Sequence, residues 1–178
     1  IYRSADRGRT WTPSSRGFDG VARVNGLASL DGGVIAAGTD RGILVSRDRG
    51  ISWSTAAIGG VGGSSRKILA ILAHLSRAFA ATENGLLRSE DGGATWHELR
   101  GLPAGKVLSL ASARGRFQAG TDGNGVLESS DGGLSWRQIG AGLPAHSQVF
   151  ELAATGSDLF AALYSRGLYR WDEWERTW

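Results

Sequence analysis

Short apolar segments, separated by turns rich in Gly, Asp and Ser, recur at a regular interval along this chain. Each repeat holds four such segments, and a Gly opens the third of them. Four strands of about 5–6 residues with short connections fill about 42 residues, which is the length of the interval. The segment from Lys67 to Leu75 alone could also form a helix, but its alignment with the equivalent segments favours a strand. The pattern predicts an all-β chain, a β-propeller of four-stranded antiparallel blades.

An eight-residue phrase, S-x-D-x-G-x-[ST]-W, follows the third apolar segment and returns every 40 to 43 residues. A degraded fifth copy, over residues 171–178, keeps only Thr177 and Trp178 and has Glu173 in the place of the Asp. A fixed period of this length is typical of repeat architectures. The recurring residues of the four full copies are Ser4, Asp6, Gly8 and Trp11; Ser46, Asp48, Gly50 and Trp53; Ser89, Asp91, Gly93 and Trp96; and Ser129, Asp131, Gly133 and Trp136.

The chemistry of this phrase fits a tight turn between two strands. The Asp can accept hydrogen bonds from backbone N–H groups that the turn leaves unpaired, and the Ser hydroxyl can do the same. The Gly supplies a positive φ where the strands meet. We expect the Trp to lie on the fourth strand and to bury its ring between sheets, where about 200 Å² at ~25 cal/mol per Å² contributes up to about 5 kcal/mol. These residues are therefore expected to be structural.

The repeats divide the chain into blades. Four-stranded units are expected over residues 21–57, 66–100, 105–140 and 147–178, and residues 1–13 hold only the third and fourth strands of a preceding blade. The whole chain, 1–178, then reads as a single propeller domain with about four and a half blades. We expect it to be part of a larger ring. The alternative is a small five-blade ring whose first blade lacks two strands, which would leave an exposed edge.

Composition removes several classes of function. The chain has no Cys, which excludes disulfides, thiol catalysis and thiolate metal sites. Its net charge is +3 and it has no Lys/Arg-rich run, so we expect no nucleic-acid partner, and no apolar stretch is long enough to span a bilayer. The three His lack metal-ligand spacing, and the Asp122-Gly-Asn124-Gly sequence lacks the Glu of a calcium loop. We therefore expect neither a metal nor a cofactor.

The phrase S-x-D-x-G-x-[ST]-W resembles the Asp-box, or bacterial neuraminidase repeat. The Gly-Leu-Pro sequences at 101–103 and 142–144, each following a Trp, resemble the links between blades of these propellers. Within that group the repeats are most similar to the photosystem II assembly and stability factor-like propellers and to sialidase-like bacterial propellers. The resemblance implies an extracytoplasmic protein (periplasmic, lumenal or secreted) that docks on a membrane-associated complex through an Arg-bearing face.

Ligand sites of propellers usually lie on the face built by the loops between the second and third strands and by the links between blades. The basic residues expected on this loop face are Arg16, Arg41, Arg66, Lys67, Arg100, Lys106 and Arg166. Their polar neighbours are Asp19, Asp40, Glu83, Asn84, Asp122, Asn124 and His146. The alternative is that all of these are ordinary solvated loop residues.

Two hypotheses for the function follow. The first is a non-catalytic interaction or assembly scaffold with a protein partner, because the chain shows the complete repeat pattern of a propeller but no recognisable set of catalytic residues. The alternative is a glycan-active propeller, either a sialidase-like or xyloglucanase-like hydrolase or a lectin-like binder. Tyr2, Tyr164 and Tyr169 do not sit in a recognisable nucleophile setting, and the recurrence of Asp40, Glu83 and Asp122 at one loop position favours a turn role. Phe18 and Tyr164 are the loop aromatics that would support glycan binding.

Overall fold

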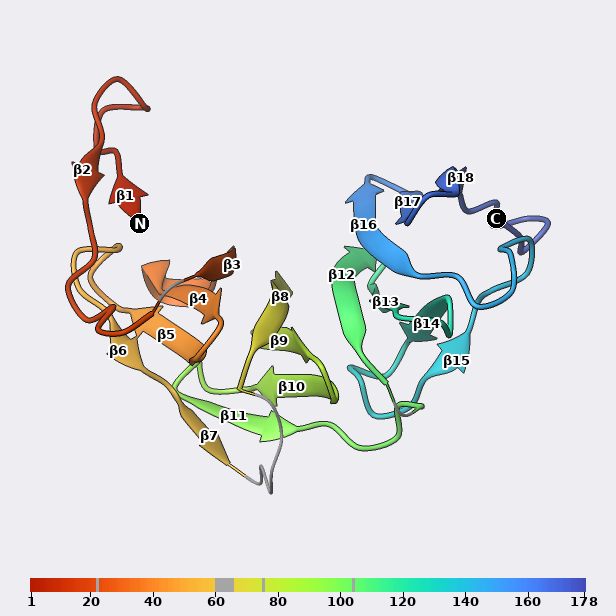
Figure 1. Cartoon of the computed structure of the whole chain (residues 1–178), viewed down its shortest axis with the longest axis horizontal. Helices are drawn as coiled ribbons and strands as arrows, with labels where there is room; N and C mark the ends of the chain where they lie inside the picture. Colours follow the sequence, from red (N-terminus) through yellow and green to blue (C-terminus); the bar gives the residue numbers. More distant parts are fainter. Residues whose placement is uncertain (22, 60–65, 75, 104) are drawn as a thin grey trace. The chain divides into compact units, whose positions relative to one another are not determined.

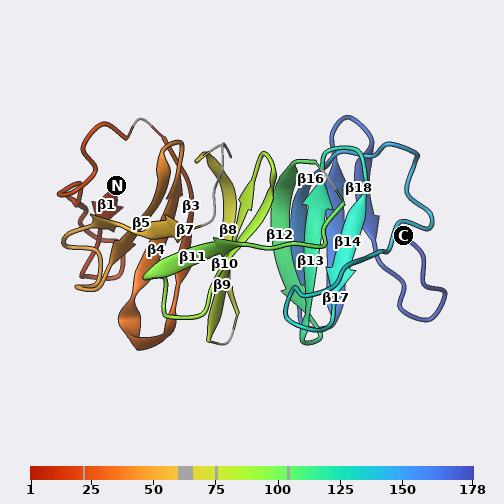
Figure 2. The ribbon, with the colours of Figure 1, turned by 90° about the horizontal axis from the view of Figure 1, so that it is seen from below.

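The computed structural model describes residues 1–21, 23–59, 66–74, 76–103 and 105–178, and nearly all of their regular structure is β-strand. The one exception is a short 3-10 turn, η1 (Asp31–Gly33). The strands form consecutive sheets along the chain (Figures 1 and 2). No helix in the described ranges is long and apolar enough to cross a membrane.

The residues cluster into two compact units. Unit 1 comprises Ile1–Ala80 and Arg88–His97, and unit 2 comprises Ala81–Leu87 and Glu98–Trp178. That the whole chain forms one propeller domain stays a prediction.

The first two sheets follow the predicted pattern. Strands β1 (Tyr2–Arg3) and β2 (Thr12–Pro13) form an antiparallel pair on either side of the first copy of the phrase. The next sheet has the order β3-β4-β5-β6, with all neighbours antiparallel. Its strands are β3 (Val24–Ser29), β4 (Ile35–Thr39), β5 (Gly42–Ser46) and β6 (Ser54–Thr55).

The third sheet has five strands in the order β7-β11-β10-β9-β8. Strand β8 (Ile68–His74) confirms the strand expected between Lys67 and Leu75, of which Leu75 lies outside the described residues. Strand β7 (Ala57–Gly59) was not expected: it belongs to the link after β6 and pairs in parallel with β11. The remaining strands are β9 (Arg77–Thr82), β10 (Gly85–Ser89) and β11 (Thr95–Glu98).

Unit 2 contains a four-stranded antiparallel sheet of the order β12-β13-β14-β15 and a three-stranded sheet of the order β16-β17-β18. Four strands were expected over 147–178, but after β18 the described chain closes a turn in which Asp172 and Thr177 form an isolated bridge. The strands are β12 (Val107–Ala113), β13 (Arg116–Thr121), β14 (Val126–Ser129), β15 (Arg137–Gln138), β16 (Val149–Thr155), β17 (Asp158–Leu163) and β18 (Gly167–Arg170).

Small residues let neighbouring sheets approach closely within each unit. In unit 1, a Cβ added to Gly38 of β4 would lie 2.6 Å from the Ile68 side chain of β8. In unit 2, a Cβ on Gly120 of β13 would lie 2.9 Å from the Val149 carbonyl oxygen of β16, and the Ser109 hydroxyl donates to that same oxygen at 3.1 Å. Packing and hydrogen bonding therefore hold these sheets together at their inner strands.

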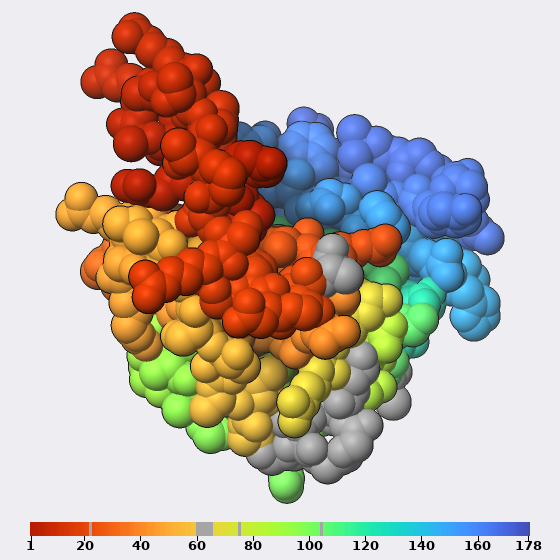
Figure 3. All heavy atoms as spheres, turned by 60° about the vertical axis from the view of Figure 1, so that its left-hand side comes forward, coloured from red at the N-terminus to blue at the C-terminus, as the bar shows by residue number. Residues whose placement is uncertain are grey.

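The Trp residues of the phrase differ in burial. Trp96 is fully buried and lies in β11, as expected. Trp53 and Trp136 immediately precede β6 and β15 instead of lying within them; Trp53 is buried and Trp136 half-buried. Trp11 also precedes its strand and is 61% exposed, so its expected burial was wrong. In Figure 3 the red N-terminal segment stands out from the orange part of unit 1.

A repeated glycine in the links packs against the next copy of the phrase. A Cβ on Gly17 would overlap the carbonyl oxygen of Trp53, and one on Gly142 would overlap the carbonyl oxygen of Trp178. Gly59 differs, because an added Cβ there would lie 3.2 Å from Nδ1 of His97 and 3.9 Å from the Trp96 carbonyl oxygen. These links thus lie against the Trp segment of the sheet that follows, and a side chain at Gly17 or Gly142 would force the link away.

Replacement of Trp96 by Ala should lower the free energy of unfolding by about 3–5 kcal/mol, because it empties a fully buried site. Trp11→Ala is the matched control and should change it by less than about 0.5 kcal/mol, since the ring is mostly exposed. Urea unfolding followed by circular dichroism measures both. Equal losses for the two variants would contradict the difference in packing.

Replacement of Gly142 by Ala should destabilise the chain by more than about 1 kcal/mol, because the new methyl group would meet the backbone at Trp178. Gly156→Ala is the control: its φ is also positive, at 57°, but no heavy atom lies within 4 Å of an added Cβ. Thermal unfolding of both variants separates the contact from backbone strain. A Gly142→Ala variant as stable as Gly156→Ala would show that the link does not pack as described.

Candidate functional site

Each of the four full copies of the phrase forms the same tight turn, and its Asp carboxylate holds that turn together. In the second copy, Asp48 Oδ1 accepts the Ser46 hydroxyl at 2.7 Å and the Ser52 N–H at 2.9 Å, and Oδ2 accepts the Ser52 hydroxyl at 2.5 Å. The Ser46 hydroxyl oxygen in turn accepts the Gly50 N–H at 2.7 Å. The residue after the Asp and the Gly both have positive φ, at 59° for Arg49 and 81° for Gly50. The carboxylate thus satisfies donors that the tight turn cannot pair internally.

These hydrogen bonds lower the pKa of each carboxyl group. The hydroxyl and then the N–H of Thr10 lower the pKa of Asp6 to about 2, and those of Thr95 lower the pKa of Asp91 to about 2. The same contacts from Ser52 and Ser135 hold the pKa values of Asp48 and Asp131 well below their usual range. A hydrogen bond to the charged form favours ionisation. The shifts therefore have a structural cause and do not indicate catalysis.

The second copy departs from the others at its Trp. In the other three copies the Trp indole N–H donates to the Gly carbonyl oxygen at 3.1 Å, as from Trp96 to Gly93. In the second copy the Ser14 hydroxyl, from the preceding link, donates to Gly50 O, and the buried Nε1 of Trp53 has no hydrogen-bond partner. The Phe18 ring instead packs edge-on to Trp53, with ring centroids 5.2 Å apart. Phe18 is therefore part of the packing of unit 1.

The degraded copy uses a different carboxylate from the one expected. Asp172 Oδ1 accepts the N–H groups of Trp174 and Glu175, at 2.9 and 3.0 Å. Glu173, which occupies the sequence position of the Asp, accepts the Trp171 indole N–H at 2.9 Å and pairs with Arg114. The turn is thus held by the residue one position earlier than the alignment places it.

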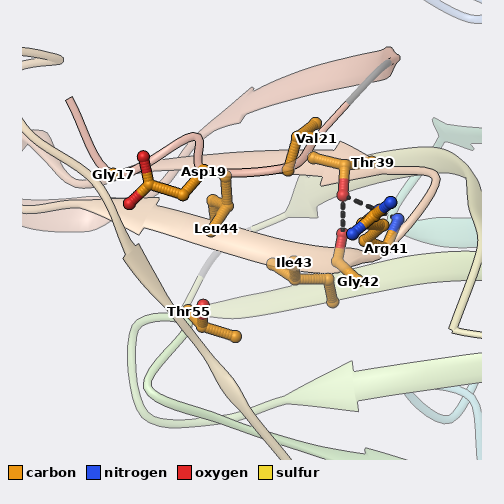
Figure 4. Close-up of a pocket in the computed structure, with 9 residues that line it drawn as sticks. All are labelled: Gly17, Asp19, Val21, Thr39, Arg41, Gly42, Ile43, Leu44 and Thr55. Atoms are coloured by element: carbon orange, nitrogen blue, oxygen red, sulfur yellow. Dashed lines mark hydrogen bonds between the residues drawn. The ribbon is translucent and has the colours of Figure 1, made fainter. Parts of the chain in front are cut away.

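A second repeated turn positions the expected loop-face residues. The Thr39 hydroxyl donates to Gly42 O at 2.8 Å and accepts the Arg41 N–H at 3.0 Å (Figure 4). Thr82 and Thr121 make the equivalent bonds across the loops that precede β10 and β14. The Thr therefore holds each of these turns, while Asp40 accepts the Arg23 N–H at 3.2 Å.

In unit 1 this turn brings Arg41 to two adjoining hollows. One, of about 90 Å³, is also lined by Asp19 and Thr39 (Figure 4). The other, of about 160 Å³, is lined by Arg41 and Arg66 together with Ile43, Ala56 and Ile58, among others. None of the acidic side chains in the described residues forms an ion pair with Arg41 or Arg66. Arg41 and Arg66 therefore line one small hollow together with aliphatic residues.

In unit 2 the loops at the ends of β13 and β17 and the link before β16 surround a larger hollow of about 400 Å³. Lys106 lies beside it, with Nζ 3.9 Å from Asp122 Oδ2. Sequence reasoning missed Gln148, whose amide donates to Asp122 Oδ1 at 2.6 Å; pairing between the two loops, which the sequence pattern does not reveal, brings them together. The lining residues are Asp122, Gly123, His146, Gln148, Tyr164, Ser165 and Arg166.

The other expected basic residues do not line these hollows. The Arg16 carbonyl oxygen accepts the Trp53 N–H at 2.9 Å, which places its backbone beside the second copy of the phrase. Lys67 immediately precedes β8, and Arg100 is exposed in the link after β11. Among the described residues, no group of three or more His, Asp or Glu side chains could hold a metal ion.

No family model and no curated protein sequence matches this chain. Several solved structures are similar to it. The Niastella koreensis GH74 enzyme has a TM-score of 0.75 and 18% identity, over 99% of this chain and 33% of that one. YCF48 bound to a D1 peptide has a TM-score of 0.67 and 20% identity, over 96% of this chain and 56% of that one. The extracellular domain of BT4673 from B. thetaiotaomicron has a TM-score of 0.69 and 21% identity, over 85% and 21%.

The fold is a β-propeller. The chain spans one third or less of the length of the GH74 enzyme and of the BT4673 domain, and these identities are low, so the likenesses show the fold alone. They include both a glycoside hydrolase and a peptide-bound protein and therefore do not decide between the two functional hypotheses.

The depressed pKa values predict loss of stability in acid. An Asp whose folded pKa is about 2 and whose unfolded pKa is about 4 contributes stability above pH 4 that is lost as the pH falls towards 2. We expect the thermal midpoint to fall steeply between about pH 4 and pH 2. The variant Asp91→Asn should be less stable at pH 7 and should flatten this dependence.

Asp31→Asn is the control, because Asp31 is exposed and the part of the chain that the structure describes shows no hydrogen bond to its side chain. This variant should leave the dependence of the thermal midpoint on pH unchanged. An Asp91→Asn profile that runs parallel to the parent profile down to pH 2 would contradict the role of this carboxylate.

Proposed function

We propose that the protein is a non-catalytic interaction propeller that binds an acidic, partly apolar segment of a protein partner. The binding site is the hollow of unit 1 that Arg41 and Arg66 line. The observation that carries this proposal is the shared hollow of Arg41 and Arg66. A guanidinium group binds carboxylates bidentately, so two of them at one hollow favour an acidic ligand.

The walls of this hollow favour a peptide over a free ion. Ile43 and Ala56 are buried and Ile58 is half-buried, and all three line it beside the charged groups. Protein interfaces combine an apolar core with charged groups at the rim, and the charges mainly set association rate and specificity. An acidic side chain flanked by apolar ones matches both features.

The similarities support this reading without deciding it. The YCF48 structure, which this chain resembles over 96% of its length, has a peptide bound. We further propose that the chain is an Asp-box propeller, since the Asp carboxylate holds the turn alike in its four full copies. We also propose an extracytoplasmic location, supported by the likeness to the extracellular domain of BT4673.

The proposal is tested with fluorescein-labelled octapeptides that alternate Glu and Leu, and with a Gln-for-Glu counterpart. The Glu peptide should bind and the Gln peptide should bind at least about tenfold more weakly, because the two guanidinium groups select for carboxylate. The double variant Arg41→Glu/Arg66→Glu should lose binding by about tenfold or more, and the affinity of the parent chain should fall as salt is added. Fluorescence anisotropy measures each affinity.

The matched control is Arg9→Glu/Arg47→Glu, which makes the same change in net charge at exposed positions of the phrase. Its affinity should stay close to that of the parent chain. Equal losses in both double variants would reduce the effect to net charge, and equal binding of the Glu and Gln peptides would overturn the site.

A further inference from the structure

The hollow of unit 2 differs in chemistry from the hollow of unit 1. Gly123 apart, every residue that lines it carries a polar side chain, and it has no aliphatic wall. Its volume of about 400 Å³ is large enough for one six-membered ring with its substituents. A peptide anchor usually needs an apolar pocket, so this lining favours a polar ligand.

The polar groups combine acceptors with donors. The Asp122 carboxylate only accepts hydrogen bonds, and the Arg166 guanidinium only donates them. The Gln148 amide holds Asp122 in place at 2.6 Å, and Lys106 offsets its charge from 3.9 Å. Within the described part of the chain, the Arg166 guanidinium makes one long bond, from Nη1 to Ala145 O at 3.5 Å, which leaves other guanidinium N–H groups for a ligand. A ligand hydroxyl group both donates and accepts, so it suits this mixture, whereas a ligand carboxylate only accepts and would use Arg166 but not Asp122.

An exposed aromatic ring completes the site. Tyr164 is 67% exposed and lines the hollow. Its backbone is fixed, because its N–H donates to Gln148 O at 3.1 Å and the next residue, Ser165, adopts a left-handed φ of 56°. The ring faces solvent from a rigid loop and can stack against the C–H face of a sugar while the polar groups bind its hydroxyls. Phe18, the other loop aromatic, packs on Trp53.

We propose that this hollow is a non-catalytic binding site for a neutral sugar ring. Tyr164 stacks on the ring, Asp122 accepts from its hydroxyl groups, and Arg166 and His146 bind the hydroxyl oxygens. The site is independent of the acidic-peptide site in unit 1, because the two share no residue.

Saturation-transfer NMR on the full chain tests the site with the methyl glycosides of glucose, galactose, mannose and xylose. At least one should receive saturation from the protein, and Tyr164→Ala should weaken its binding by about tenfold. Tyr164→Phe keeps the ring and should bind within about threefold of the parent chain. Asp122→Asn keeps the shape but exchanges an acceptor for a donor and should also weaken binding.

The matched control is Tyr2→Ala, which removes a tyrosine that is 66% exposed and belongs to unit 1. It should not change the signal, and thermal unfolding confirms that each variant is folded. Absence of transfer to all four glycosides overturns the site, as does transfer that Tyr164→Ala leaves intact. Binding of the Glu-containing octapeptide that depends on Tyr164 and Arg166, without sugar binding, also overturns it and assigns the hollow to acidic peptides.

Discussion

The repeats depend on one interaction, the hydrogen bonds that the backbone N–H groups of the tight turn donate to a single Asp carboxylate. Between the third strand and the Trp, the chain reverses through two successive residues of positive φ, which leaves backbone N–H groups without partners in the sheet. In the third copy, Asp91 accepts the N–H and the hydroxyl of Thr95, and Ser89 accepts the Gly93 N–H. The turn then delivers Trp96 to the Gly93 carbonyl oxygen and into the core. A backbone N–H group left without an acceptor in this turn would lower the stability of the fold by about as much as the loss of one hydrogen bond.

The Trp segment that follows this turn also contacts the link that precedes the same sheet in the chain. The link that enters each sheet lies against the Trp segment at the far edge of that sheet, as β7 lies along β11 and as the Trp178 N–H donates to Ala141 O. Gly17 and Gly142 allow this contact because a side chain there would collide with the backbone opposite, whereas a side chain at Gly59 would first meet the His97 ring. Within unit 1 the sheets of β3 and β8 also pack together at their inner strands, and within unit 2 the sheets of β12 and β16 do the same, as in other repeat proteins whose stability comes from neighbouring repeats.

The sequence predicted those features that depend on local chemistry. The order of four successive strands and the acceptor role of the Asp in the turn follow from residue types at fixed spacing; the four-strand order is seen in the sheets of β3–β6, β8–β11 and β12–β15, and the Asp turn in all four full copies of the phrase. Features that depend on distant neighbours were not predictable. Trp11 and Trp96 occupy the same position in the phrase, yet only Trp96 is buried, because burial depends on what packs over the ring. In the last copy, Glu173 reaches Trp171 and Arg114, and this leaves the turn to Asp172. The Gln148–Asp122 contact joins residues 26 positions apart and carries no local signal.

The two candidate sites show how a repeat can present different chemistry at one loop position. Arg41 and Arg166 occupy the same position, just before the Gly that opens the third strand of their sheets, and both line a hollow. Their surroundings decide the chemistry. Beside Arg41 lie Ile43, Ala56 and a second Arg, so an acidic and partly apolar ligand is favoured. Beside Arg166 lie Asp122 and an exposed Tyr164, so a hydroxylated ring, whose hydroxyl groups both donate and accept, fits better. The Thr39 hydroxyl holds the loop of Arg41, whereas the loop of Arg166 has Leu163 in the place of the Thr and is held by the Tyr164 N–H, which donates to Gln148 O. Because the backbone is held in both loops, their side chains can change without disturbing the sheets, and different blades can offer different chemistry at the same loop position.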